Sequence, residues 1–253
     1  MPTIEIDYAR ISFPEALDYL SEKTNLDTDS YIEGQGIAQD VAFTVAAAKG
    51  QLLQDIRDAM DRSISNGESV DKFLVRFNNI AASYTDDWPL KGGNSWRGAL
   101  IYQQNIRQAY NAGRYAQMTD PDVVKLRPYW QWRHGNSEAP RLTHLALDGK
   151  VFPADSLPFF PPAGFNCACS VFSLSQRDVD RRGLEVEDLE MGQDLEVFDP
   201  SNGQTRTVKL QPDKGFDRIP GKSTPEQRAK VLERLDPLLR EQVVQESGVD
   251  VEY

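Results

Sequence analysis

The stretch of residues 129–169 constrains the fold most, because it contains both histidines and both cysteines of a 253-residue chain. The histidines are His134 and His144, and the cysteines are Cys167 and Cys169. The same stretch carries five prolines, each of which lacks an amide N–H and disrupts a helix. We therefore expect a compact, loop-rich unit with short strands, which something other than a regular hydrogen-bonded ladder must hold together.

The four rare residues have the composition of a tetrahedral zinc site, in which thiolates bind at about 2.3 Å and imidazoles at about 2.0–2.1 Å. Their spacing is looser than in common zinc motifs, because one residue separates the cysteines and the histidines are ten positions apart. The pattern predicts that His134, His144, Cys167 and Cys169 converge on zinc or another soft divalent ion. We also expect a tight turn between Pro162 and the cysteines.

Two other interpretations of these residues stay open. The first is a pair of buried thiols beside two hydrogen-bonded histidines, with no metal. The second is a cysteine nucleophile activated by His144, although a second thiol two residues away suits a ligand pair better. The chain contains no Walker, G-x-S-x-G, H-E-x-x-H or dinucleotide-binding pattern.

Helices are predicted before this stretch from the recurrence of apolar residues at every third or fourth position. We expect a short helix that begins near Ser12, a long one over residues 37–65 with Gly50 inside it, and two more over 70–84 and 95–118. Asn66 and Gly67 should end the long helix, since both tolerate a left-handed backbone. The last helix is rich in glutamine and asparagine, which indicates a face that is either solvated or meets a partner.

Beyond the central stretch, a polar segment from Ser175 should begin with a short helix. In residues 195–210, apolar residues or threonines alternate with charged residues on either side of Pro200–Gly203, which predicts a β-hairpin. A further helix should follow Ser223. The fold class is therefore α+β. We expect three parts: a helical N-terminal region over 1–118, a core with the His/Cys cluster over 119–180, and a hairpin and helical tail over 181–253.

Charge and hydropathy restrict the partners. The net charge of −11 argues against a general nucleic-acid binder, because phosphate affinity rests on clustered basic residues. Only residues 89–150 have a basic excess, with nine basic and four acidic side chains, so we expect weak, non-specific DNA contact at most. The sequence has no apolar run of membrane-spanning length and no apparent signal peptide, so we expect synthesis in the cytoplasm and no membrane contact.

Three ordered blocks resemble the signature of the phage Mu F-like minor head proteins, also called head morphogenesis proteins. The blocks are WQWRH at 130–134, PRLTHLALDG at 140–149 and PPAGFNCAC at 161–169, and IRQAYNAGRY at 106–115 is similar to the segment that precedes them in the family. The resemblance covers about residues 12–180. The positions of His134, His144, Cys167 and Cys169 match those of the family.

The resemblance implies a structural, non-enzymatic protein of a tailed bacteriophage virion, present in few copies. Such a protein is made in the host cytoplasm and resides in the head or head–neck region. It associates with the portal protein and other head proteins during head assembly. The alternative function is a metal-dependent hydrolase acting on nucleic acid or peptide, which would need an open metal position beside a general base such as Asp148 or Asp155.

Overall fold

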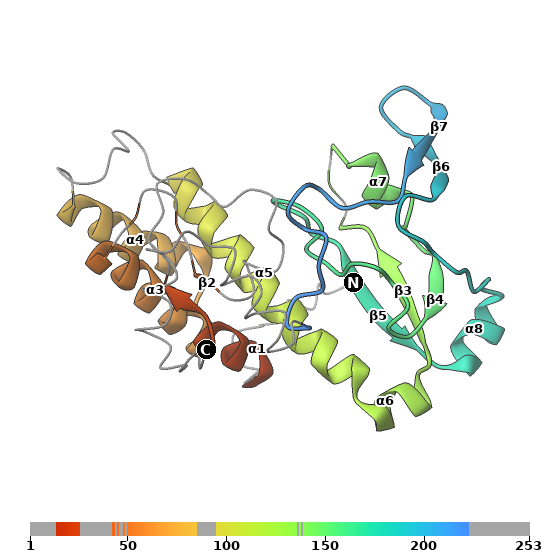
Figure 1. Cartoon of the computed structure of the whole chain (residues 1–253). Coiled ribbons are helices and arrows are strands. Elements are labelled where there is room, and N and C mark those ends of the chain that lie inside the picture. Colours follow the sequence, from red (N-terminus) through yellow and green to blue (C-terminus); the bar gives the residue numbers. More distant parts are fainter. Residues whose placement is uncertain are drawn as a thin grey trace, which may run out of the picture. The chain divides into compact units, whose positions relative to one another are not determined.

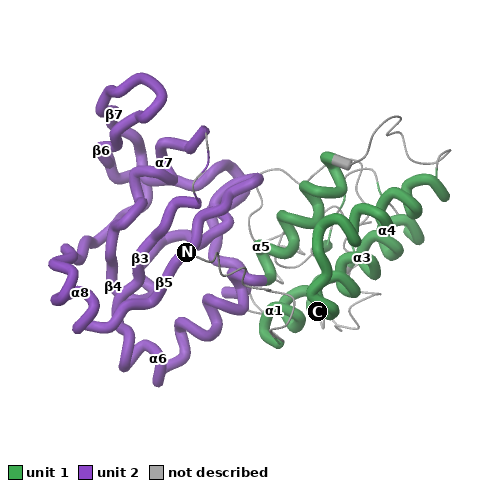
Figure 2. The backbone as a smooth tube through the Cα atoms, turned by 180° about the vertical axis from the view of Figure 1, so that it is seen from behind, with its two compact units in different colours: residues 1–32, 37–109, 224–253 green, residues 33–36, 110–223 purple. Residues whose placement is uncertain are grey.

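The computed structural model describes residues 14–25, 42–43, 45, 48, 50–84, 95–135, 137 and 139–222. These residues form two compact units, one made of the residues up to 109 and the other of residues 110–222 (Figure 2). Helices dominate the first unit, whereas short strands and loops build most of the second (Figure 1). The predicted α+β class is therefore confirmed. None of the helices in the described ranges is long and apolar enough to cross a membrane.

The first unit packs α1 (Pro14–Ser21), α3 (Gly50–Ser65), α4 (Val70–Ser83) and the first part of α5 (Ser95–Thr119). Its core is the apolar stripe of α3, and Leu53, Ile56 and Met60 are fully buried there. Phe73 and Phe77 of α4 belong to the same buried cluster, with their ring centroids 5.8 Å apart. The periodicity of apolar residues predicted this face because tertiary packing of one stripe stabilises most helices.

The long helix is shorter than we predicted. Ala42–Phe43 forms β2, which pairs in parallel with β1 (Thr24–Asn25), and α3 begins only at Gly50. The φ angle of Gly50 is +51°, a left-handed conformation that glycine adopts without steric cost and that interrupts a right-handed helix. The predicted end is confirmed, since α3 stops at Ser65 and Gly67 has a φ of +56°.

Three of the amide side chains of α5 are not part of the solvated or partner-facing surface that we predicted. Gln104, Gln108 and Asn111 are all buried, with exposed fractions of 5–8%. The buried Lys23 donates from its Nζ to the Gln108 Oε1 at 3.2 Å. A partner could reach these three amides only after the surrounding chain moved away.

A three-stranded antiparallel sheet with the order β4-β3-β5 forms the centre of the second unit. Its strands are β3 (Tyr129–Arg133), β4 (Val151–Pro153) and β5 (Ser170–Leu174). The short helix α6 (Pro121–Leu126) precedes the sheet and was not predicted. Its N-terminus shows two common helix-start features. Pro121 lies in the first turn, and the Asp120 side chain accepts hydrogen bonds from the Asp122 and Val123 amides.

Aromatic rings fill the core beneath the central strand. Tyr115 of α5, Trp130 of β3 and Phe160 of the β4–β5 loop meet edge to face, with ring centroids 5.6–5.9 Å apart. Each such pair contributes roughly 0.5–1.5 kcal/mol beyond the area it buries. This cluster anchors the long proline-rich loop against the sheet, so the loop keeps a defined course without regular secondary structure.

The predicted short helix and hairpin of the tail are both present. Helix α8 (Gln176–Arg182) starts with a capping box between Ser175 and Asp178. Strands β6 (Asp194–Asp199) and β7 (Gln204–Lys209) form the hairpin, and β6 buries alternate side chains. The short helix expected near Ser12 is present as α1, which begins at Pro14, whereas the helix expected after Ser223 lies outside the described residues.

Candidate metal centre

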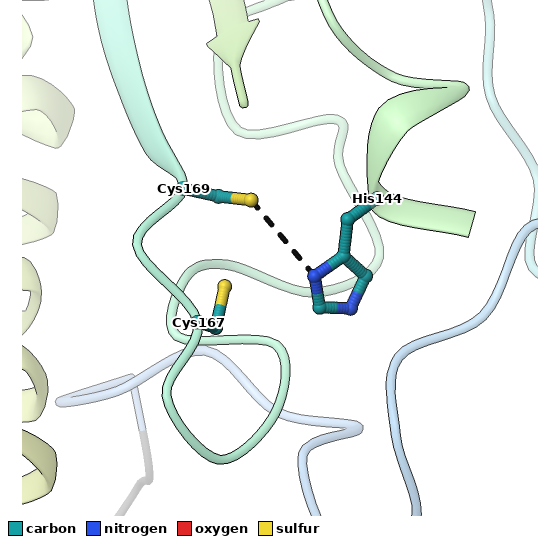
Figure 3. Close-up of side chains that lie close together, drawn as sticks. All are labelled: His144, Cys167 and Cys169. Carbon is teal, nitrogen blue, oxygen red and sulfur yellow. Dashed lines mark hydrogen bonds between the residues drawn. The ribbon is translucent and has the colours of Figure 1, made fainter. Parts of the chain in front are cut away.

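Three of the four predicted ligands come together in the second unit. His144 lies on the short helix α7 (Leu142–Leu145), Cys167 lies in the β4–β5 loop, and Cys169 directly precedes β5. One potential ligand atom of each residue lies within 4.8 Å of the other two. The two sulfurs and the His144 Nδ1 face one another, and Nδ1 lies 3.9 Å from the Cys169 sulfur (Figure 3).

The predicted turn positions the two cysteines. The Cys167 amide donates to the Gly164 carbonyl at 3.2 Å, and Asn166 adopts a φ of +56°. Arg141, at the N-terminal end of α7, connects this turn to the helix. It donates to the Phe165 carbonyl at 2.7 Å and forms an ion pair with Asp213 at 2.9 Å. The contacts of Arg141 with Phe165 and Asp213 therefore hold α7, and with it His144, next to the cysteine turn.

Two residues that sequence reasoning did not select complete the walls of the cluster. The fully buried Trp132 of β3 lies edge to face with the His144 ring, at a centroid distance of 6.5 Å. Gly135 approaches the cysteine loop so closely that a Cβ built on it would lie 2.2 Å from the Ala168 carbonyl oxygen. A glycine one residue after a predicted histidine ligand was the available signal for this close approach.

A hydrogen bond between the two cysteines shifts their pKa values in opposite directions. A hydrogen bond from Cys169, followed by the nearby His144, outweighs burial and lowers the pKa of Cys167. The hydrogen bond to Cys167 and burial raise the pKa of Cys169, against the influence of the Gly135 amide and the Trp132 indole. The pair therefore favours one thiolate and one thiol, with N–H donors directed at the sulfur of Cys169.

His134 lies outside the three-residue group. Its side chain is half-buried, and its backbone amide donates to the Asp148 carboxylate at 2.8 Å. Asp148 also lies 3.4 Å from the Arg133 guanidinium, and Asp155 accepts from Tyr115 at 2.6 Å. Both candidate general bases thus have structural partners of their own.

Comparison with known proteins agrees with the resemblance of the three sequence blocks. Residues 54–172 match the family model described as "Phage Mu protein F like protein", and this range includes all four His and Cys positions. The match spans somewhat under half of the chain, and over these residues the chain is similar to the phage Mu F-like family. No solved structure matches the chain.

Two relatives extend the similarity beyond residues 54–172. The "Putative capsid assembly protein F" of Escherichia phage Mu is 32% identical over 281 aligned positions, which include 96% of this chain and 63% of the relative. The "Mu-like prophage FluMu F protein" of Haemophilus influenzae is 31% identical over 197 positions, or 70% of this chain and 47% of the relative. The chain thus spans less than two thirds of the length of either relative.

Proposed function

We propose that this chain is a structural protein of a tailed-phage head, present in few copies, that acts during head assembly together with the portal and other head proteins. The observation that carries the proposal is the alignment of 96% of the chain with a protein named as a putative capsid assembly protein. The match of residues 54–172 to the Mu F-like family is consistent with it. On this proposal the protein is made in the host cytoplasm and resides in the head or head–neck region.

The burial of the His/Cys cluster supports a structural role over a hydrolytic one. His144, Cys167 and Cys169 have exposed fractions of only 2–6%. A hydrolytic metal must admit water and substrate to an open coordination position, whereas a structural metal is enclosed by protein ligands. Asp148 and Asp155 also argue against a hydrolytic site, because each has a hydrogen-bond partner elsewhere and neither carboxylate belongs to the three-residue group.

Contact with DNA is a minor part of the proposal. The basic excess of residues 89–150 supports at most a weak, non-specific contact with packaged DNA. Such contacts release counterions, so their affinity falls steeply with rising salt. Sequence-specific binding that persists at about 0.5 M salt would contradict this part of the proposal.

The head role can be tested with a phage that carries an amber codon in this gene, grown with and without a suppressor. The suppressed phage is the matched control, because it differs only in whether the protein is made. We expect the protein in purified heads from the suppressed culture, cross-linked to the portal, and few DNA-filled heads without suppression. Normal numbers of filled, infectious particles that lack the protein would refute the role.

A further inference from the structure

The dimensions of the buried cluster suit a tetrahedral metal ion. Bond lengths of about 2.3 Å to sulfur and 2.0–2.1 Å to nitrogen separate neighbouring ligand atoms by roughly 3.4–3.8 Å. The observed Cys169 Sγ to His144 Nδ1 distance is 3.9 Å, and every pair within the group lies inside 4.8 Å. Movements of less than about 1 Å would therefore bring three ligand atoms to bonding distance.

Two groups with N–H donors lie against the cluster, the Gly135 backbone and the Trp132 indole. Gly135 closely approaches Ala168 of the cysteine loop, and the Trp132 ring lies edge to face with the His144 ring at a centroid distance of 6.5 Å. That indole N–H has no regular hydrogen-bond partner among the described residues, although the Trp132 side chain is fully buried. Donors of this kind orient metal-bound thiolates and stabilise their charge.

The same contact brings His134 near the cluster. Gly135, at which a Cβ would lie 2.2 Å from the Ala168 carbonyl oxygen, directly follows His134 in the chain. The hydrogen bond to Asp148 holds the His134 backbone in place. The half-buried His134 lies two residues after Trp132, whose ring contacts His144, and its side chain can change rotamer about χ1 and χ2.

We propose that His144, Cys167 and Cys169 bind one zinc-class divalent cation, and that His134 rotates to become the fourth ligand. Two thiolates balance the two positive charges of the ion, so the buried site carries no net charge, which burial would otherwise penalise. The ligands follow β3, lie on α7 and precede β5, and the ion thus cross-links three segments of the second unit. This inference does not rest on the proposed head role.

The proposal can be tested on the purified full-length chain. We expect about one zinc per chain by elemental analysis, and its release in step with two thiols during titration with an organomercurial. Cobalt substitution should give the intense visible bands of a four-coordinate ion and a thiolate-to-metal charge-transfer band. Absence of stoichiometric metal, after purification and after zinc is added back, would overturn the whole site and leave the head role untouched.

Two substitutions separate the fourth ligand from the other three. Loss of His134 in His134→Ala should weaken zinc binding by about 100-fold or more, since four ligands share the large affinity of structural zinc. The cobalt bands should also weaken and shift as water replaces the imidazole. Ser137→Ala, an exposed position in the same loop, is the matched control and should bind like the wild type. If His134→Ala keeps the wild-type cobalt spectrum and affinity, His134 is not a ligand.

Discussion

Replacing Gly135 by alanine tests how closely the β3 end and the cysteine loop must approach each other. The new Cβ would lie 2.2 Å from the Ala168 carbonyl oxygen and 2.5 Å from both its carbonyl carbon and its Cβ. An ordinary contact begins near 3.4 Å, so the two segments must separate by about 1.2 Å. The obstacle is mostly backbone, which cannot rotate away as a flexible side chain could.

The expected cost follows from that displacement. Overpacking of this kind destabilises by about 1–3 kcal/mol, and a backbone obstacle belongs at the upper end of that range. The lower chain entropy of unfolded alanine offsets about 0.4–1 kcal/mol of the cost. A net loss of roughly 2 kcal/mol corresponds to a fall in Tm of about 4–8 °C for a domain of this size.

Thermal unfolding followed by circular dichroism measures the effect. Gly183→Ala is the comparison, because its Cβ would meet nothing within 4 Å and only its φ of +57° opposes the change. That variant should lose about 1 kcal/mol, the usual cost of a left-handed non-glycine residue. The close-approach argument fails if Gly135→Ala melts within 1 °C of the wild type, or if Gly183→Ala loses more stability than Gly135→Ala.

Three further sets of substitutions test the packing and polar contacts of the second unit. Phe160→Ala removes a fully buried ring and should cost about 3–5 kcal/mol in urea unfolding, whereas Phe198→Ala, at a 60% exposed ring, should stay within about 0.5 kcal/mol. Ser175→Ala removes the cap of α8 and should cost about 1 kcal/mol. Combining it with Asp178→Ala should cost less than the sum of the two single losses, and additive losses would contradict a shared capping box. Hydrogen bonds from the Ser201 hydroxyl and amide lower the pKa of Asp199 in the folded protein. The ionised Asp199 therefore stabilises the fold fully above its unfolded pKa of about 3.9, and this contribution is lost as the pH falls through its folded pKa. The Tm difference between the wild type and Asp199→Ala should therefore shrink steadily between about pH 5 and pH 2, and a constant difference would contradict the assignment.

Local sequence rules determined much of this fold. Apolar periodicity predicted α4 and α5 nearly to their ends, Asn66 and Gly67 marked the end of α3, and the alternating segment around Pro200–Gly203 predicted the hairpin. The signals for these elements lie within a few residues of one another, because helix periodicity, caps and turns depend on neighbouring backbone angles. The grouping of both histidines and both cysteines in one stretch likewise indicated where a cluster could form.

Only the tertiary structure decided which of these residues meet. Apolar periodicity predicted one long helix that continues through Gly50. In the structure β2 pairs with β1 and Gly50 has a left-handed conformation, so α3 begins only at Gly50. The amides of α5 look like surface residues by type, yet contacts from distant segments such as Lys23 bury them. Residue type also could not distinguish the two histidines. His144 faces both sulfurs, whereas His134 does not belong to their group. These outcomes depend on contacts between residues far apart in the chain, such as Gly135 with Ala168, which no local pattern encodes.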